Sequence, residues 1–366
     1  MLSVLSFSKG KKQFLNNLLN RLYKLFISKK PLVLFEACAP FHLEHFKNVI
    51  LKLSNQDNFL IAVISPDTRS MGKLNNVCFY TTIDDFPLYK KADVFISTEL
   101  RLMPFWFNCP SVFFGHGMGP KLNYQAGGGL LQKFDYILSP CRPTYDVQIN
   151  STSKEKVYPL GMPILDDLSF REEHIYSHFN LDKNKPLMIY APSWCNNISK
   201  VSDIKLITSL LQDKSQFNII ISPHPSLFNP ERCKGEVFFP SQDGSHNLNI
   251  NTPDSDFTTL ELVKASTLVI SDISSILFEA MALNKIVFFD GNKALYEYCE
   301  ALEIYDEVVK VCPIPIWGNI DDQTIEQTLK NDEHASDRAH FINHYLFNNG
   351  NASNVFIKQI SEILKL

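Results

Sequence analysis

The sequence predicts an α/β fold made of two Rossmann-like domains, each built on a parallel sheet. Short apolar runs such as "LVLFEA" (32–37) and "TLVIS" (267–271) alternate with helical or turn-rich stretches. The runs are continuous rather than alternating, which is typical of parallel strands buried on both faces. They fall into two series of similar length, and 366 residues with 45% hydrophobic content are enough for two separate cores.

The two series of predicted strands define the domains. The first series comprises "LVLFEA" (32–37), "FLIAVI" (59–64), "VCFY" (77–80), "DVFIS" (93–97), "SVFFG" (111–115) and "YILS" (136–139). The second comprises "PLMIYAP" (186–192), "FNIIISP" (217–223), "EVFFP" (236–240), "TLVIS" (267–271) and "KIVFFD" (285–290). With a join near 160–185, we expect domains at 31–165 and 166–345. The last segment, 346–366, is predicted to be a helix that can pack back on the first domain.

Residues 1–30 form a separate basic segment, because they contain seven Lys or Arg residues and no acid. Within "KKQFLNNLLNRLYKLFISKK" (11–30) adjacent apolar pairs recur every four residues, so a helix here carries one apolar stripe. Such a helix can lie in the interface of an anionic membrane, with its cations near the lipid head groups. The alternative is a helix packed on the first domain with its lysines in water. The sequence leaves both interpretations open.

Composition and charge exclude several classes of protein. The formal net charge of −4 gives no basic excess for a nucleic-acid partner. No apolar run is long enough to predict a spanning helix, and the N-terminus lacks the apolar core and cleavage site of a signal peptide. The eight cysteines contain no C-x-x-C pair, which favours reduced thiols in a cytosolic protein. No metal-binding motif occurs, so we expect neither a metal nor a cofactor.

Polar residues directly follow several predicted strands, where open parallel sheets bind their ligands. In "LVISDISSILFEA" (268–280), Asp272, Ser274 and Ser275 stand between an apolar strand and an apolar helix that begins at about Ser275. The first N–H groups of a helix have no partner within it and attract anions. The sequence thus indicates a phosphate-binding turn to which the serine hydroxyls add donors. The alternative is a serine that only caps the helix.

Two further strand ends of the second series carry candidate ligands. His224 lies between two prolines in "ISPHPSLF" (221–228), which restrict the backbone and present the imidazole rigidly. It can hydrogen-bond a phosphate or donate a proton to a leaving group, although a lone loop histidine is more often structural. Ser193 directly follows the strand predicted at 186–192, so we expect it at the same edge of the sheet.

One strand end of the first series combines a histidine with glycines. In "SVFFGHGMGPK" (111–121) His116 stands between two glycines, and Gly117 permits close approach of a ligand or of another part of the chain. Neutral histidine accepts a proton near pH 7, so His116 is a candidate general base. Lys121 can neutralise phosphate charge. The alternative is a tight glycine turn with a solvated histidine.

The order of these motifs resembles that of the CDP-glycerol glycerophosphotransferases of the teichoic-acid polymerase type. It comprises a glycine-flanked histidine with a following lysine, G-x-P-x-x-D, Y-A-P-[ST]-[WF], P-H-P, S-D-x-S-S and a C-terminal "FINHYLFNNGNASNVFIKQI", over residues 111–362. The resemblance implies a GT-B fold, in which two Rossmann-like domains face a central cleft. It also implies transfer of a polyol phosphate from a CDP-activated donor to an acceptor hydroxyl, with release of CMP.

The resemblance implies a role for each candidate residue. His116 would be the general base that deprotonates the acceptor, and Gly117 and Lys121 are candidate contacts of the acceptor or the phosphate. The residues implied at the donor phosphates are His224, Ser193, Ser274 and Ser275, with Asp272 ordering their turn. The acceptor would be a surface polymer or a lipid-linked molecule, reached from the cytoplasmic face of the membrane. The chain departs from the family pattern at "HGMGPK", at Ile164 and after "APSW". These departures leave the identity of the polyol and of the acceptor open.

Three other functions are compatible with the same pattern. A GT-B glycosyltransferase would use a nucleotide sugar and react at a sugar carbon. A nucleotide-sugar 2-epimerase would have a similar fold and would work without an acceptor. A membrane-bound GT-B subunit without activity of its own would support polymer synthesis unchanged after His116→Ala and His224→Ala. The nucleotide released from a panel of donors separates the first two from the phosphotransferase.

Overall fold

The structure is a computed structural model that describes residues 30–68, 71–72, 74, 76–82, 92–100, 108–115, 117–194, 204, 207–209, 211, 214–229, 231, 248–313 and 322–366. The amphipathic helix predicted at 1–30 lies outside the described residues, apart from Lys30, and so does the strand predicted at 236–240. Every other strand of the two predicted series is present.

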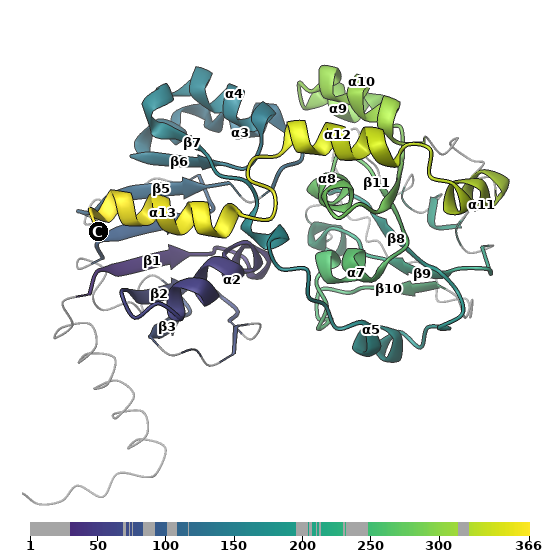
Figure 1. The fold of residues 1–366 in the computed structure, drawn as a ribbon, viewed down its shortest axis with the longest axis horizontal. Coiled ribbons are helices and arrows are strands. Elements are labelled where there is room, and N and C mark those ends of the chain that lie inside the picture. Colours follow the sequence, from purple (N-terminus) through teal and green to yellow (C-terminus); the bar gives the residue numbers. More distant parts are fainter. Residues whose placement is uncertain are drawn as a thin grey trace, which may run out of the picture. The chain divides into compact units, whose positions relative to one another are not determined.

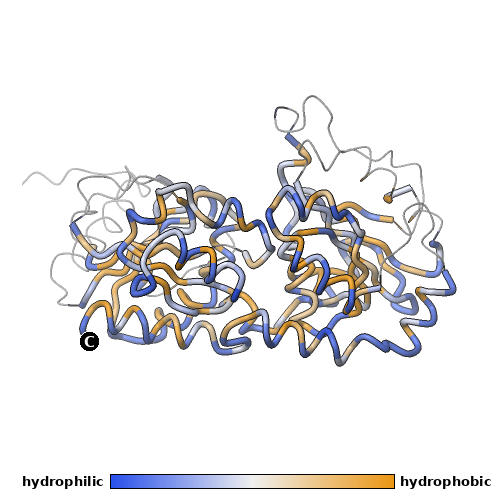
Figure 2. Tube along the Cα trace, turned by 90° about the horizontal axis from the view of Figure 1, so that it is seen from above, coloured by the Kyte–Doolittle hydropathy of each residue, from blue (hydrophilic) through white to orange (hydrophobic). Residues whose placement is uncertain are grey.

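The chain forms two compact units. The first holds the described residues among 30–115, 129–138 and 353–366, and the second holds those among 117–128 and 139–352. Hydrophobic residues gather in the interior of the units, whereas the outer coils of the tube carry hydrophobic residues on one side and hydrophilic residues on the other (Figure 2). The described α-helices are α2 (Pro40–Ser54), α3 (Leu122–Gln125), α4 (Arg142–Ser151), α5 (Glu172–His178), α7 (Thr259–Ala265), α8 (Ser275–Ala282), α9 (Lys293–Tyr298), α10 (Leu302–Val311), α11 (Asp322–Lys330), α12 (Ala335–Tyr345) and α13 (Ala352–Leu364).

The first sheet has seven described strands in the order β3-β2-β1-β4-β5-β6-β7. They are β1 (Leu32–Glu36), β2 (Leu60–Ile64), β3 (Val77–Tyr80), β4 (Val94–Ser97), β5 (Ser111–Phe114), β6 (Tyr136–Ser139) and β7 (Val157–Pro159). The pairs from β3 to β6 are parallel, and Glu36 lies in register with Ser97 of β4. Every residue of β1, β2, β4 and β5 is buried, which explains their unbroken apolar sequences.

Phenylalanines join α2 and α13 to the first sheet. The ring of Phe35 in β1 lies 5.0 Å from Phe46 of α2 and 6.2 Å from Phe356 of α13. Phe114 of β5 contacts the same two helices, at 5.4 Å from Phe46 and 5.8 Å from Phe356. The last helix of the chain therefore completes the core of the first sheet (Figure 1).

The second sheet has five described strands in the order β10-β9-β8-β11-β12, all paired in parallel. They are β8 (Leu187–Ala191), β9 (Asn218–Ile221), β10 (Leu248–Ile250), β11 (Leu268–Ser271) and β12 (Ile286–Phe289). The sequence did not predict β10, which has three residues, each only half-buried, in a run that alternates with asparagine. The prediction of an α/β fold with two parallel sheets is confirmed.

Each sheet contains one point at which the strand order reverses. The order runs outward from β1 through β2 and β3 on one side and resumes with β4 on the other, and it does the same around β8, with β11 on the far side. At such a switch point the connections leave a crevice outside the carboxyl ends of the two central strands. The fold therefore provides two positions for ligands, one in each sheet.

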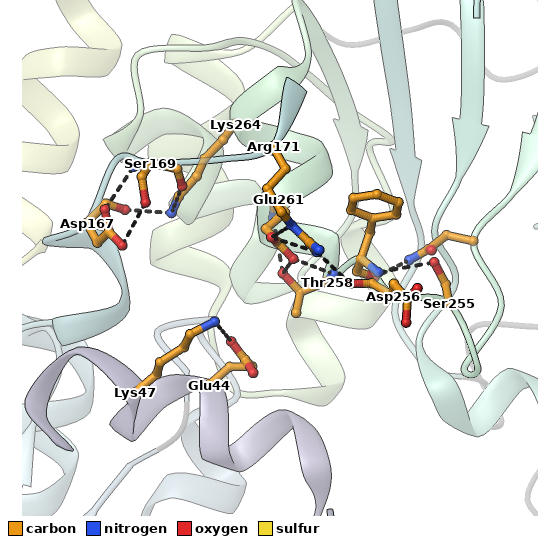
Figure 3. A network of polar contacts seen from close by, with 12 residues as sticks. Glu44, Lys47, Asp167, Ser169, Arg171, Ser255, Asp256, Thr258, Glu261 and Lys264 are labelled. Carbon is orange, nitrogen blue, oxygen red and sulfur yellow. Dashed lines mark hydrogen bonds and ion pairs between the residues drawn. The ribbon is translucent and has the colours of Figure 1, made fainter. Parts of the chain in front are cut away.

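A polar network ties the segment before α5 to α7 in the second unit (Figure 3). Lys264 Nζ donates to the carbonyl oxygens of Asp167 and Ser169, and Arg171 Nε donates to Glu261 Oε1 at 3.2 Å. Glu261 also forms a capping box with Thr258, whose side chain accepts from the Glu261 backbone at 3.2 Å. These contacts hold the segment that precedes α5 and β8 against α7.

Candidate active site

The carboxyl ends of β8 and β11 meet at the switch point of the second sheet. Ala191, the last residue of β8, lies in register with Ser271, the last residue of β11. Ser271 Oγ donates to the Ala191 carbonyl at 2.6 Å. The residues that follow, Ser193 and Asp272, are 2% and 3% exposed. Two strand ends far apart in the sequence therefore form one ordered edge.

The Asp272 carboxylate holds this edge together. Its Oδ2 accepts from the Ser193 backbone N–H at 2.8 Å, and its Oδ1 accepts from Ser193 Oγ at 2.6 Å and from the Ser274 backbone N–H at 2.9 Å. Burial raises the pKa of Asp272, whereas these donors and the Lys121 cation lower it. Because both oxygens accept hydrogen bonds, the arrangement suits the ionised carboxylate. Asp272 thus orders the turn from within.

The helix α8 begins at Ser275, as the sequence predicted. Ser274 is its N-cap, and the Ser274 side chain accepts from the Ile276 backbone N–H at 3.4 Å. Burial raises the pKa of Glu279, one turn later in α8, to about 7, although the Ser275 side chain acts in the opposite direction. The N-terminal end of α8 therefore points its dipole to the edge formed by Ser193 and Asp272.

The glycine-rich segment after β5 lies against the start of α8. A Cβ atom on Gly119 would stand 2.8 Å from the Ile273 carbonyl oxygen and 2.9 Å from the Ser275 backbone nitrogen. Gly117 has φ +146° and lies beside the Ser275 side chain. The carbonyl of Met118 accepts from the Tyr345 hydroxyl at 2.7 Å. Glycine is required here because two backbones touch.

This segment carries Lys121 to the same edge. Lys121 Nζ lies 3.7 Å from the centroid of the Trp194 ring, and Trp194 directly follows Ser193. Among the residues that the structure describes, Nζ makes no hydrogen bond and no ion pair. Burial lowers the pKa of Lys121 to about 8, although Asp272 acts in the opposite direction. A lysine cation thus stands next to the α8 N-terminus with its donors unused.

His224 follows β9, the next strand beyond β8. Its backbone N–H donates to the Pro192 carbonyl at 3.2 Å, which joins it to the β8 end. Nδ1 accepts from the Ser226 backbone N–H at 3.2 Å and lies 2.7 Å from Ser226 Oγ. Since Nδ1 accepts an N–H bond, the proton of the neutral ring is on Nε2. The ring lies edge-on to Trp194 at 6.5 Å.

The predicted site residues gather at one place in the second unit, with one exception. Those brought to the carboxyl ends of β8, β9 and β11 are Gly117, Lys121, Ser193, His224, Asp272, Ser274 and Ser275. His116, the predicted general base, lies outside the described residues. Sequence reasoning overlooked Trp194 and Gly119, although Trp194 stood in the Y-A-P-[ST]-[WF] motif. Within the described ranges, no group of His, Cys, Asp or Glu residues could hold a metal ion.

The sequence model of one protein family matches most of the chain. Its description is CDP-Glycerol:Poly(glycerophosphate) glycerophosphotransferase, and it matches residues 128–362. The range includes the ends of β8, β9 and β11 and the start of α8. No curated protein matches the chain significantly.

Solved structures resemble the chain over nearly its whole length. The wall teichoic acid polymerase TagF has a TM-score of 0.64 and 16% identity, over 98% of this chain and 99% of that chain. UDP-GlcNAc 2-epimerase from Neisseria meningitidis, bound to UDP-GlcNAc, has a TM-score of 0.60 and 16% identity, over 91% and 100%. MnaA from S. aureus with UDP has a TM-score of 0.60 and 13% identity, over 92% and 97%. At these identities the likeness establishes the fold alone, and it confirms the GT-B class.

Proposed function

The chain belongs to the CDP-glycerol:poly(glycerophosphate) glycerophosphotransferase family, and from this premise we propose how its second unit performs the transfer. The enzyme is a transferase of the CDP-glycerol glycerophosphotransferase type. In the proposed reaction an acceptor hydroxyl oxygen forms a bond to the β-phosphorus of CDP-glycerol. The bond from that phosphorus to the bridging oxygen breaks, and CMP leaves with the electron pair. The acceptor proton passes to a base.

The observation that carries the proposal is the set of donors at the β8–β11 switch point. The Asp272 carboxylate aligns Ser193 with Ser274 at the N-terminus of α8, and the Lys121 cation, which pairs with no carboxylate of the described residues, lies on the same edge. A helix N-terminus, hydroxyl groups and an ammonium are the groups that stabilise phosphate charge. Phosphoryl transfer needs chiefly positioning and charge stabilisation, so such a set is sufficient without a covalent intermediate.

In this proposal each group has one task. Ser274, through its hydroxyl, and Lys121 bind the donor pyrophosphate, and Asp272 keeps their turn in place. Ser193, predicted from the sequence as a phosphate ligand, instead helps to hold the turn, because its N–H and its hydroxyl both donate to Asp272. Nε2 carries the proton of neutral His224, so His224 donates to the phosphate that leaves with CMP. Ser275 contributes its backbone N–H, because it is the first residue of α8. His116 stays the proposed general base for the acceptor.

The acceptor and the membrane contact belong to the proposal as well. The family description names poly(glycerophosphate), and the solved relative is a wall teichoic acid polymerase. We therefore expect a glycerol phosphate polymer or its lipid-linked primer as the acceptor. Within the ranges that the structure describes, no helix has the length and apolarity needed to span a bilayer. Contact with an anionic membrane through residues 1–30 thus remains a prediction.

A donor panel tests the proposed function. The full chain is incubated with CDP-glycerol, CDP-ribitol, UDP-GlcNAc or other nucleotide sugars, with and without a glycerol phosphate oligomer, and the released nucleotide is identified. We expect CMP from CDP-glycerol, with release dependent on the oligomer, and elongation of the oligomer by one glycerol phosphate unit per CMP. Conversion of UDP-GlcNAc without an acceptor would instead identify an epimerase. Release of UDP together with a glycosylated product would identify a glycosyltransferase.

A further inference from the structure

An aromatic ring, rather than a carboxylate, holds the cation of the candidate site. Lys121 Nζ lies 3.7 Å from the centre of the Trp194 ring and, within the described residues, forms no ion pair. The neighbouring carboxylate of Asp272 already accepts hydrogen bonds from Ser193 and Ser274 on both of its oxygens. The ammonium group is therefore held in place without being neutralised.

The choice of partner decides whether the cation can act on a phosphate. A carboxylate paired with Lys121 would compete with an incoming phosphate for its N–H groups. The face of an indole ring attracts an ammonium through the ring quadrupole but offers no lone pair in exchange. The donors of Lys121 therefore remain available to an anion. Tryptophan is the side chain that gives the strongest contact of this kind.

Neighbouring residues hold both Lys121 and Trp194 in position. Trp194 follows Ser193, which Asp272 holds through the backbone and the hydroxyl. The Trp194 ring lies edge-on to Tyr124, with centroids 6.3 Å apart. The Lys121 backbone N–H donates to the Gly119 carbonyl at 2.8 Å, and the next residue, Leu122, donates to the Cys299 carbonyl at 3.2 Å. The pair is thus part of the same ordered edge as the serine donors.

We propose that Trp194 is a positioning residue that holds the Lys121 ammonium, charged and unpaired, against the phosphates of the donor. The inference rests on the proposed function, because it takes the anion at this edge to be the pyrophosphate of a CDP compound. Trp194 acts through Lys121 and does not itself touch the phosphates. Burial lowers the pKa of Lys121 to about 8, as expected for a cation without an anionic partner, and a bound phosphate would raise it again.

A double-mutant cycle on CDP binding tests the proposal. Calorimetry at pH 7 measures the affinity of the full chain for CDP in the unmodified protein, Trp194→Leu, Lys121→Ala and the double variant. We expect Trp194→Leu to weaken binding by roughly 5- to 20-fold, which corresponds to the loss of a cation–π contact. In the Lys121→Ala background the same change should alter the affinity by less than about twofold, because its target has gone.

Two further variants keep the test decisive. Trp194→Phe retains a ring and should weaken CDP binding less than Trp194→Leu. It replaces the leucine variant in the cycle if that variant unfolds below the assay temperature. Tyr305→Leu is the matched control, because it removes the ring that lies 5.7 Å from Lys293 elsewhere in the second unit and should leave the CDP affinity unchanged.

Each outcome of the cycle has one interpretation. Equal losses from Trp194→Leu with and without Lys121 would mean that Trp194 contacts the ligand directly, and would overturn the proposal. Unchanged affinity in both the leucine and the phenylalanine variants would overturn it too. If the unmodified protein fails to bind CDP, the proposed function is wrong, and this result is distinct from a failure of the Trp194 inference.

Discussion

The two sheets of the molecule share a strand order but carry different groups at their switch points. At the first, Glu36 ends β1 and accepts from Ser97 Oγ at 3.1 Å, while Nε2 of the buried His42 lies 3.4 Å from Glu99. The ionisable groups named there are two carboxylates and a histidine. At the second, both oxygens of Asp272 accept hydrogen bonds, and the lysine ammonium of Lys121 has no ion pair with any residue in the described ranges.

The difference shows how one topology can serve two kinds of ligand. The topology places a switch point in each sheet, but only the residues there decide which ligand can bind. Two carboxylates would repel a pyrophosphate, whereas an ammonium beside a helix N-terminus attracts it. We therefore expect changes at the second switch point to weaken donor binding and changes at the first to leave it intact. Four measurements test that contrast.

The largest effect is expected from Asp272→Ala. The change leaves the Ser193 and Ser274 donors without their acceptor, so we expect kcat/KM for CDP-glycerol to fall on the order of 10²- to 10³-fold. The free energy of unfolding should fall by about 2–4 kcal/mol, because buried donors lose their partner. Thr258→Ala, which removes the cap of α7 in the same unit, is the control and should leave kcat/KM within about twofold. Near-normal turnover by a folded Asp272→Ala protein would refute the contrast.

Gly119→Ala should have the next largest effect. Its Cβ would stand 2.8 Å from the Ile273 carbonyl oxygen, so the segment that carries Lys121 must move away from α8. We expect kcat/KM to fall by about 10²-fold, the cost of misplacing a binding group by about 1 Å. Gly128→Ala adds a Cβ in open space and is the matched control, although φ +50° makes it costly for stability. Equal activity of the two alanine variants would contradict the close contact.

The pH dependence of kcat/KM should report the Lys121 cation. Burial lowers its pKa to about 8, so the free enzyme holds the charged form below that pH and loses it as pH rises. We expect kcat/KM for CDP-glycerol to decline by about tenfold per pH unit above pH 8. In Lys121→Arg the cation persists, so the decline should move to higher pH. An unshifted decline in the arginine variant would assign the titration to another group.

The smallest effect is expected at the first switch point. Ser97→Ala removes one hydrogen bond from the Glu36 carboxylate and should lower the free energy of unfolding by about 1–2 kcal/mol. The affinity for CDP, measured by calorimetry, should stay within about twofold of the unmodified protein. If Ser97→Ala weakened CDP binding as much as Asp272→Ala does in the same measurement, both switch points would serve the same ligand.

Local patterns in the sequence predicted the strands and the turn before α8, which we propose binds phosphate. The run 268–280 changes from a continuous apolar stretch to helical spacing at Ser275, and the structure begins α8 at that residue. The strand β10 was missed because its three half-buried residues lie in a stretch that reads as a polar loop. A hydrophobic pattern predicts a strand only when some of its residues are fully buried. A short edge strand with half-buried residues therefore shows no such pattern.

The remaining part of the site could not be predicted because it depends on contacts between distant segments. Lys121 and Trp194 are separated by most of the chain between β5 and β8. No local sequence pattern therefore predicts that the Lys121 ammonium contacts the Trp194 ring. The sequence does not distinguish Gly119 from the neighbouring glycines, whereas the structure places its Cα directly against the backbone at the start of α8. Motif order located the residues, whereas only the fold identified the partners of each.

The packing of α13 on the first sheet has a consequence for synthesis of the chain. Phe35 and Phe114 are translated long before Phe356, which covers both. Part of the aromatic core of a nascent first sheet therefore stays uncovered until α13 has been translated. A stop codon just before α13 would leave every described strand of the second sheet in the product and would still damage the first unit.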